Sequence, residues 1–229
     1  MPARAATPGP GVVTESDEPD RPTEVLEIET PLGPARAHLW APQRRPVGRI
    51  VLGHGAGGGI GAADLVAVRR AAVAAGWQAV LVEQPWRVAG KKVAAAPPKL
   101  DIGWHAVLAE LPTLKRPLVL GGRSAGARVA CRTAADLGAR AVCCLAFPLH
   151  PPGKPEKSRA AELALPHQAG IEVLVVQGEK DPFGGWAEVE AEQLPGVTVA
   201  RVEGDHSLKK YGPVAEAVAA RLTDWSKSV

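Results

Sequence analysis

The sequence predicts a single α/β domain, with a mostly parallel, twisted sheet of about seven to eight strands, helices on both faces and no large lid. Three observations support this fold class. Continuous apolar runs such as residues 139–147 and 170–178 are typical of strands buried on both faces. Stretches with helical spacing separate these runs. The chain has 229 residues, 46% of them apolar, which is enough for one large core.

The first elements are a tail and a hairpin. Residues 1–22 mix Pro, Gly, Ser, Thr and acidic residues with little apolar content, so we expect a flexible N-terminal tail before a single domain at 23–229. Residues 25–30 and 35–42 favour extended structure and flank a proline and glycine turn, which predicts a hairpin.

The remaining elements alternate along the chain, and no linker to a second domain interrupts them. Strands are predicted at 48–54, 77–84, 116–122, 139–147, 170–178 and 197–204. Helices are predicted at 62–75, from a cap at Asp101 to about Leu111, at 125–137, at 184–194 and at 214–225. Residues 85–99 and 148–159 are predicted as loops because they are rich in Pro, Gly and Lys.

Charge and cysteine usage exclude several classes of protein. Lys and Arg number 27 against 24 Asp and Glu, and this near balance does not indicate nucleic-acid binding. Three cysteines, two of them adjacent, form neither a disulfide framework nor a zinc or redox motif. The longest nearly apolar run, residues 71–82, is too short to span a bilayer. We therefore expect a cytoplasmic protein without membrane or nucleic-acid partners, cofactor or metal; the sequence leaves the oligomeric state open.

The most informative motif is Gly122-Arg123-Ser124-Ala125-Gly126, which reads Gly-x-Ser-x-Gly between a predicted strand and a predicted helix. A nucleophile elbow needs small residues on either side of a strained turn, because the turn lifts the serine hydroxyl above the edge of the sheet. The placement of the motif therefore predicts Ser124 as a nucleophile.

A serine hydroxyl also needs a base, and the base needs an acid that fixes its tautomer. Asp181 and His206 each follow a predicted strand, and in a parallel sheet the carboxyl ends of the strands share one edge. We therefore predict Ser124, Asp181 and His206 as a triad. Alternatives remain: Asp181 could be a turn or cap residue, Asp205 is a rival acid, and His150, which also follows a strand, is a rival base.

A second glycine cluster, residues 53–59, lies between a strand and a helix. An oxyanion hole pairs the N–H after the nucleophile with an N–H from such an earlier loop, so we assign these donors to Ala125 and Ala56. The competing interpretation is a dinucleotide site, since the cluster also contains Gly-x-Gly-x-x-Gly and Glu83 ends the next strand. That interpretation leaves the elbow, Asp181 and His206 unexplained.

Together these segments resemble the α/β-hydrolase superfamily, and in particular its small dienelactone-hydrolase-like branch, which includes testis-expressed and NSL-complex-subunit-like hydrolases. The resemblance rests on GHGAGG (53–58), EQPWRVAGKK (83–92), LVLGGRSAGARVA (118–130), FPLHPPGKPEK (147–157), VQGEKDPFG (176–184) and GDHSLK (204–209). It implies the α/β-hydrolase fold, with Ser124 as nucleophile, Asp181 as acid and His206 as base, in agreement with the assignment from the residues themselves. Ala125 stands where the branch usually has methionine, which predicts a wider pocket floor.

The expected function is that of a serine hydrolase acting on a small-molecule ester or acyl substrate without a cofactor. Loops 85–99 and 148–159 carry many Lys and Arg residues, so the substrate is expected to be anionic if these loops form the rim of the site. The rim residues predicted on this basis are His54, Trp86, Arg87, His150 and Lys154. Two alternatives are a catalytically silent interaction module with the same fold and a dinucleotide-binding oxidoreductase.

Overall fold

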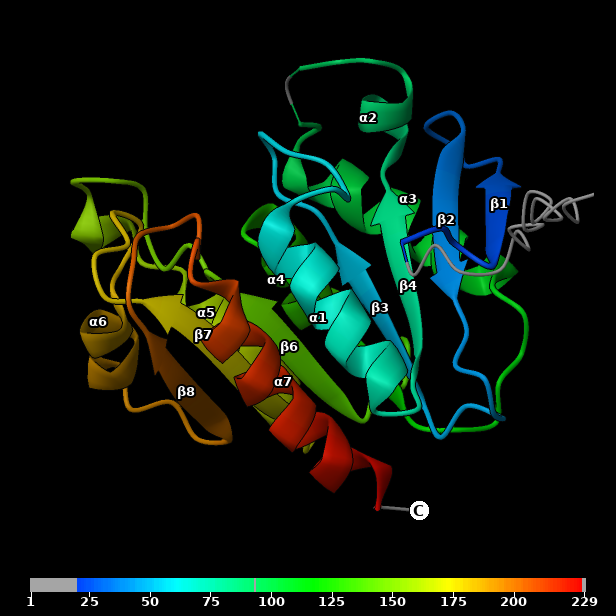
Figure 1. Cartoon of the computed structure of the whole chain (residues 1–229). Helices are drawn as coiled ribbons and strands as arrows, with labels where there is room; N and C mark the ends of the chain where they lie inside the picture. Colours follow the sequence, from blue (N-terminus) through cyan, green and yellow to red (C-terminus); the bar gives the residue numbers. More distant parts are fainter. Residues whose placement is uncertain (1–19, 93, 228–229) are drawn as a thin grey trace, which may run out of the picture.

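The computed structural model describes residues 20–92 and 94–227, and it confirms the predicted fold class (Figure 1). Eight strands form one open sheet in the order β1-β2-β4-β3-β5-β6-β7-β8. The strands are β1 (Glu24–Ile28), β2 (Ala35–Trp40), β3 (Arg49–Gly53), β4 (Gln78–Glu83), β5 (Leu118–Arg123), β6 (Ala141–Leu145), β7 (Glu172–Gly178) and β8 (Val197–Val202). Because β2 pairs antiparallel with both β1 and β4 while all other pairs are parallel, β2 alone runs against the rest.

Helices cover both faces of this sheet. They are α1 (Ala63–Ala74), α2 (Pro85–Val88), α3 (Pro97–Glu110), α4 (Ala125–Thr133), α5 (Ala160–Gln168), α6 (Trp186–Ala191) and α7 (Tyr211–Ser226), with a short 3-10 helix, η1, at Pro155–Lys157. Figure 1 shows α1 and α7 in front of the sheet and α3 and α4 behind it. Within the described residues, no inserted domain covers the carboxyl edge of the sheet.

Each face of the sheet has its own apolar core. The core under α1 and α7 contains Leu65, Val218 and Trp225, and the core under α3, α4 and α5 contains Trp104, Val129 and Leu163. Side chains of a strand alternate between the two faces, so the adjacent residues Cys143 and Cys144 belong to different cores. Burial alone raises the pKa of the Cys143 thiol to about 12, so this thiol stays protonated and unreactive in the folded protein.

Three details of the predicted elements are wrong. Residues 85–99 are not one loop, since α2 occupies Pro85–Val88 and α3 begins at Pro97. Asp101 is therefore no helix cap; it lies inside α3 and accepts two hydrogen bonds from Arg132 of α4, at 2.6 and 2.8 Å. The sequence pattern also gives no helix at Ala160–Gln168, where the structure has α5.

Most of the predicted tail, residues 1–19, lies outside the described residues. Asp20, near the end of the predicted tail, contacts the domain. Its carboxylate pairs with Arg69 and Arg70 of α1, and its backbone carbonyl oxygen accepts a hydrogen bond from the Trp40 indole at 3.3 Å. In the described part of the chain, no helix has both the length and the apolar character needed to cross a membrane.

Candidate active site

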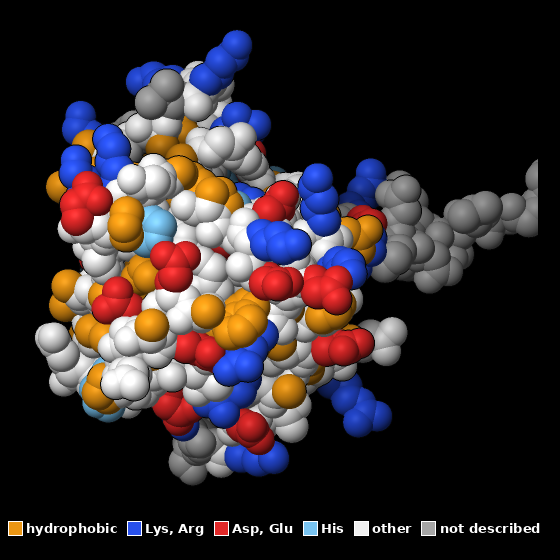
Figure 2. Space-filling model, turned by 90° about the vertical axis from the view of Figure 1, so that its left-hand side faces the viewer, with side chains coloured by type: hydrophobic (Ala, Val, Ile, Leu, Met, Phe, Trp, Pro, Cys, Tyr) orange, Lys and Arg blue, Asp and Glu red, His pale blue; other side chains and the backbone are white. Residues whose placement is uncertain are grey.

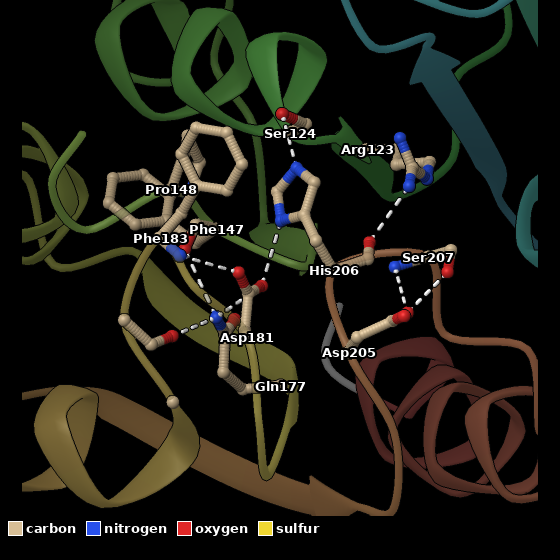
Figure 3. Close-up of polar contacts among 12 residues, drawn as sticks. Arg123, Ser124, Phe147, Pro148, Gln177, Asp181, Phe183, Asp205, His206 and Ser207 are labelled. Carbon is tan, nitrogen blue, oxygen red and sulfur yellow. Dashed lines mark hydrogen bonds and ion pairs between the residues drawn. The ribbon is translucent and has the colours of Figure 1, made fainter. Parts of the chain in front are cut away.

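Three side chains meet above the carboxyl edge of the sheet, each from the segment that follows a different strand (Figure 3). Ser124 follows β5, Asp181 follows β7 and His206 follows β8. Nε2 of His206 lies 2.9 Å from Oγ of Ser124, and Nδ1 of His206 lies 2.8 Å from Oδ2 of Asp181. The ring therefore bridges a hydroxyl and a carboxylate that are 57 residues apart in sequence, which is the arrangement of a nucleophile, a base and an orienting acid.

The turn that carries Ser124 is strained. Ser124 has φ 52° and ψ −109°, and residues other than glycine rarely adopt a positive φ. Its N–H donates to the carbonyl of Leu145 on β6 at 2.9 Å, which fixes the turn to the neighbouring strand. Neighbouring glycines make the turn possible, since a Cβ on Gly122 or Gly126 would lie only 2.4 or 2.3 Å from the carbonyl oxygen of Gly53.

The carboxylate of Asp181 is held on both oxygens. Its side chain is fully buried; Oδ1 accepts from the N–H of Phe183 at 2.8 Å, and Oδ2 accepts from Nε2 of Gln177 at 3.0 Å as well as facing His206. Gln177 is also buried and donates to the carbonyls of Phe147 and Gly184. This amide thus ties the acid to two loops at the edge of the sheet.

The loop after β3 lies beside the elbow, where the oxyanion donors were predicted. Neither the N–H of Ala56 nor that of Ala125 donates to an acceptor among the described residues. Ala56 lines the same cleft as Ser124. The loop is ordered by His54, whose Nδ1 lies 2.9 Å from the carbonyl oxygen of Gly55 and whose Nε2 accepts from the N–H of Gln84 at 3.4 Å.

The His54 ring is buried, and burial lowers its pKa, so this imidazole is neutral and donates through Nδ1. It therefore supports the backbone of the loop and does not line the rim. Glu83, the acid of the alternative dinucleotide interpretation, points toward β2, where its carboxylate lies 3.2 Å from His38.

Fold and sequence together decide the family. A family model described as an alpha/beta hydrolase domain matches residues 46–226. The chain belongs to the α/β-hydrolase superfamily. A search of the curated proteins found no match.

Solved structures of other α/β-hydrolases share this architecture. A serine hydrolase homologue from Coxiella burnetii is 18% identical, with a TM-score of 0.71 over 89% of this chain and 97% of that chain. A serine hydrolase without lid from Xanthomonas campestris is 21% identical, with a TM-score of 0.69 over 91% and 98%. Est1E from Butyrivibrio proteoclasticus is 16% identical, with a TM-score of 0.73 over 89% and 99%. At these identities the likeness is one of fold.

The face of this α/β-hydrolase that carries Ser124 contains an open cleft of about 650 Å³. Ser124 and His206 line it, together with the glycine loop, Phe183, Lys209 from the segment before α7 and Tyr211, the first residue of α7. The Phe183 ring lies 4.3 Å from the His206 ring, centroid to centroid, and covers one side of the imidazole. The cleft thus exposes Ser124 and His206 to solvent between the aromatic ring of Phe183 and the glycine loop.

The predicted rim residues do not line this cleft. Trp86 is buried against His54, and it lines a separate cavity of about 300 Å³ together with Lys91 and Lys99. Arg87 is exposed and approaches the glycine loop, since a Cβ on Gly59 would lie 3.5 Å from its Nε. Lys154 is exposed on the loop before η1. Figure 2 shows blue Lys and Arg side chains projecting from the upper end of the molecule. The rest of this face carries both positive and negative side chains.

His150, the rival base, is buried away from Ser124. Its Nδ1 lies 2.9 Å from the carbonyl oxygen of Pro151, and its Nε2 lies 3.0 Å from Oε2 of Glu188 in α6. Both acceptors raise the pKa of this histidine. Oε1 of Glu188 accepts from the N–H of Gly185, so the pair braces the loop that follows Asp181.

Sequence reasoning missed three residues around the triad, and each left a signal. Gln177 is a polar residue at the end of an apolar strand, and Phe183 follows the Asp-Pro turn. Arg123 occupies the position between Gly122 and Ser124 that the Gly-x-Ser-x-Gly pattern leaves unspecified, and Figure 3 shows its side chain reaching the backbone of His206. No group of three or more His, Cys, Asp and Glu that could hold a metal ion lies within residues 20–92 and 94–227.

Proposed function

We propose that this α/β-hydrolase is a serine hydrolase that cleaves small-molecule esters through an acyl-enzyme. The observation that carries the proposal is the position of His206, within 2.9 Å of the Ser124 hydroxyl and 2.8 Å of the Asp181 carboxylate. A non-catalytic interaction module would have no need to keep a strained serine aligned with both partners.

The reaction proceeds in two halves. Nε2 of His206 takes the proton of Ser124 while Oγ bonds to the carbonyl carbon, and the oxyanion rests on the N–H groups of Ala56 and Ala125. His206 then gives that proton to the leaving alkoxide as its C–O bond breaks, which leaves an acyl-serine. Water attacks the acyl group, His206 takes its proton and returns it to Oγ, and the acid is released. The Asp181 carboxylate, 2.8 Å from Nδ1, stabilises the imidazolium.

The proposed substrate class is supported by the open cleft and by the neighbours. A cleft of about 650 Å³ accommodates a small molecule. Structural neighbours from Rhodothermus marinus and Pyrobaculum calidifontis are described as an esterase domain and an esterase, and Est1E is described with ferulic acid bound. Arg87 near the glycine loop and Lys209 in the cleft favour an anionic ester. Comparing kcat/KM for neutral and carboxylated esters at two salt concentrations tests this preference, and equal values at both concentrations would rule it out.

A fluorophosphonate probe tests the nucleophile directly, because it phosphonylates only an activated serine. We expect labelling of the wild type and none of Ser124→Ala. Ser207→Ala is the matched control, since Ser207 is the next residue after His206 and should leave labelling intact. Labelling of Ser124→Ala would refute the assignment, and an inert wild type would favour the interaction module.

A further inference from the structure

Arg123 connects three segments that meet at the catalytic centre. Its backbone ends β5 and directly precedes Ser124. Nη2 of the guanidinium donates to the carbonyl oxygen of His206 at 2.8 Å, and Nε lies 2.9 Å from Oδ2 of Asp64 (Figure 3 draws the first contact). Only 17% of the Arg123 side chain is exposed. One planar group therefore joins the elbow to the loop of the base and to the start of α1.

The partner of Arg123 is itself fixed. The Asp64 side chain is 1% exposed, and its Oδ1 accepts from the N–H of Leu65 in the first turn of α1. Burial raises the pKa of the Asp64 carboxyl, and the Arg123 charge opposes that rise. Gly55 completes the arrangement, because a Cβ there would lie 3.0 Å from Nη1 of Arg123 and crowd the guanidinium.

The His206 loop needs such a support. It has no regular structure between Val202, the last residue of β8, and Tyr211, the first of α7, and it passes through the buried Leu208 with φ 47°. The ring of His206 is held by Ser124 and Asp181, but its backbone carbonyl is held by Arg123. A shift of that backbone would move Nε2 relative to the serine.

We propose that Arg123, anchored by Asp64, is a positioning residue that sets the distance between His206 and Ser124. It makes no bond to the reacting atoms and acts through the peptide of His206. This inference rests on the proposed hydrolase function, and it adds the residue that determines how efficiently the base serves the nucleophile.

Arg123→Met removes the guanidinium and keeps the length of the side chain. Because a displacement of about 1 Å at a reacting group costs about 100-fold in rate, we expect kcat for 4-nitrophenyl acetate to fall roughly 10- to 100-fold, with KM within about twofold of the wild type. In Arg123→Lys the ammonium group reaches only one of the two partners, the His206 carbonyl or Asp64, so its kcat should lie between those of the wild type and Arg123→Met. Arg128→Met is the matched control: Arg128 is also partly buried and ion-paired, with Glu162, but does not contact His206, so its kcat should stay within about twofold.

A double-mutant cycle separates positioning from a merely structural role. If Arg123 acts through His206, Arg123→Met should have little further effect on the residual rate in a His206→Ala background. An equal fall in both backgrounds, an effect on KM alone, or an unchanged kcat would overturn the inference. Arg123→Lys in the same cycle decides the matter if Arg123→Met does not fold.

A readout independent of turnover keeps the inference distinct from the proposed function. Nδ1 of His206 lies 2.8 Å from Oδ2 of Asp181, so we expect the proton between them to give a downfield NMR signal in the wild type. We expect Arg123→Met to weaken or shift this signal and Arg128→Met to leave it in place. If the wild type proves inert toward the probe, the hydrolase proposal fails, and an unchanged signal in Arg123→Met would still refute the positioning role on its own.

Discussion

Replacing Gly126 with alanine should separate the two backbones that meet behind the nucleophile. Gly126 is the second residue of α4, and a Cβ there would lie 2.3 Å from the carbonyl oxygen and 2.5 Å from the carbonyl carbon of Gly53, at the end of β3. Ordinary contact begins near 3.4 Å, so the helix and the strand must move apart by about 1 Å. Both atoms belong to the main chain, and no side-chain rotation can relieve the contact.

The size of the effect follows from this geometry. Overpacking of a close-packed core costs about 1–3 kcal/mol, and a clash between main-chain atoms belongs at the upper end of that range. In a domain of this size, about 3 kcal/mol lowers the melting temperature by roughly 6–12 °C. Because Ser124 precedes the displaced helix and Ala56 follows the displaced strand, a shift of about 1 Å should also slow labelling by the fluorophosphonate probe about 100-fold.

Calorimetry and labelling kinetics measure both effects on the same preparations. Gly61→Ala is the control, since nothing lies within 4 Å of the Cβ that would be added at Gly61, and this variant should melt and react as the wild type does. A Gly126→Ala protein that melts within about 2 °C of the wild type and labels at the same rate would refute the argument from close approach.

Two further predictions concern buried polar groups. Gln177→Met removes the amide that donates to Asp181 and to two backbone carbonyls. We therefore expect the free energy of unfolding to fall by about 2–4 kcal/mol, which lowers the melting temperature by roughly 5–15 °C. A decrease of less than about 2 °C would contradict this prediction. The pKa of His150 is higher in the folded protein than in the unfolded chain, where it is about 6.5. The pairing of His150 with Glu188 therefore stabilises the fold fully below about pH 6.5, and this stabilisation is lost as the pH rises through the pKa of His150 in the folded protein. Glu188→Gln should therefore lower the melting temperature more at about pH 5.5 than at about pH 8.5; an equal loss at both would show that His150 is not charged in the pair.

The main architecture could be predicted because its signals are local. Continuous apolar runs identified the buried strands, and the Gly-x-Ser-x-Gly motif between a strand and a helix identified the elbow. Asp181 and His206 could be predicted because the carboxyl ends of parallel strands meet at one edge. The roles of these residues, and of Ala56 and Ala125 as oxyanion donors, stay predictions that the proposed experiments test.

The errors arose where tertiary contacts override local propensity. Helix α5 contains Pro166 and has little amphipathic pattern, yet it forms because Leu163 packs into the core. Helix α3 begins earlier than the sequence pattern predicts: Pro97 and Pro98 are typical of a loop, but proline is also favoured in the first turn of a helix. The contact between Arg123 and His206 spans 83 residues, and no local pattern can predict such a pairing.

The two adjacent thiols on β6 offer a way to observe how this domain opens. Cys143 is covered by the layer of α1 and α7, and Cys144 by the layer of α3, α4 and α5. A thiol reagent applied in mild denaturant therefore reports which layer detaches first: early modification of Cys143 alone would mean that the C-terminal helix leaves before the elbow is disturbed. Simultaneous modification of both would mean that the sheet and its two coverings unfold as one cooperative unit. The chain thus carries its own pair of unfolding probes, one residue apart.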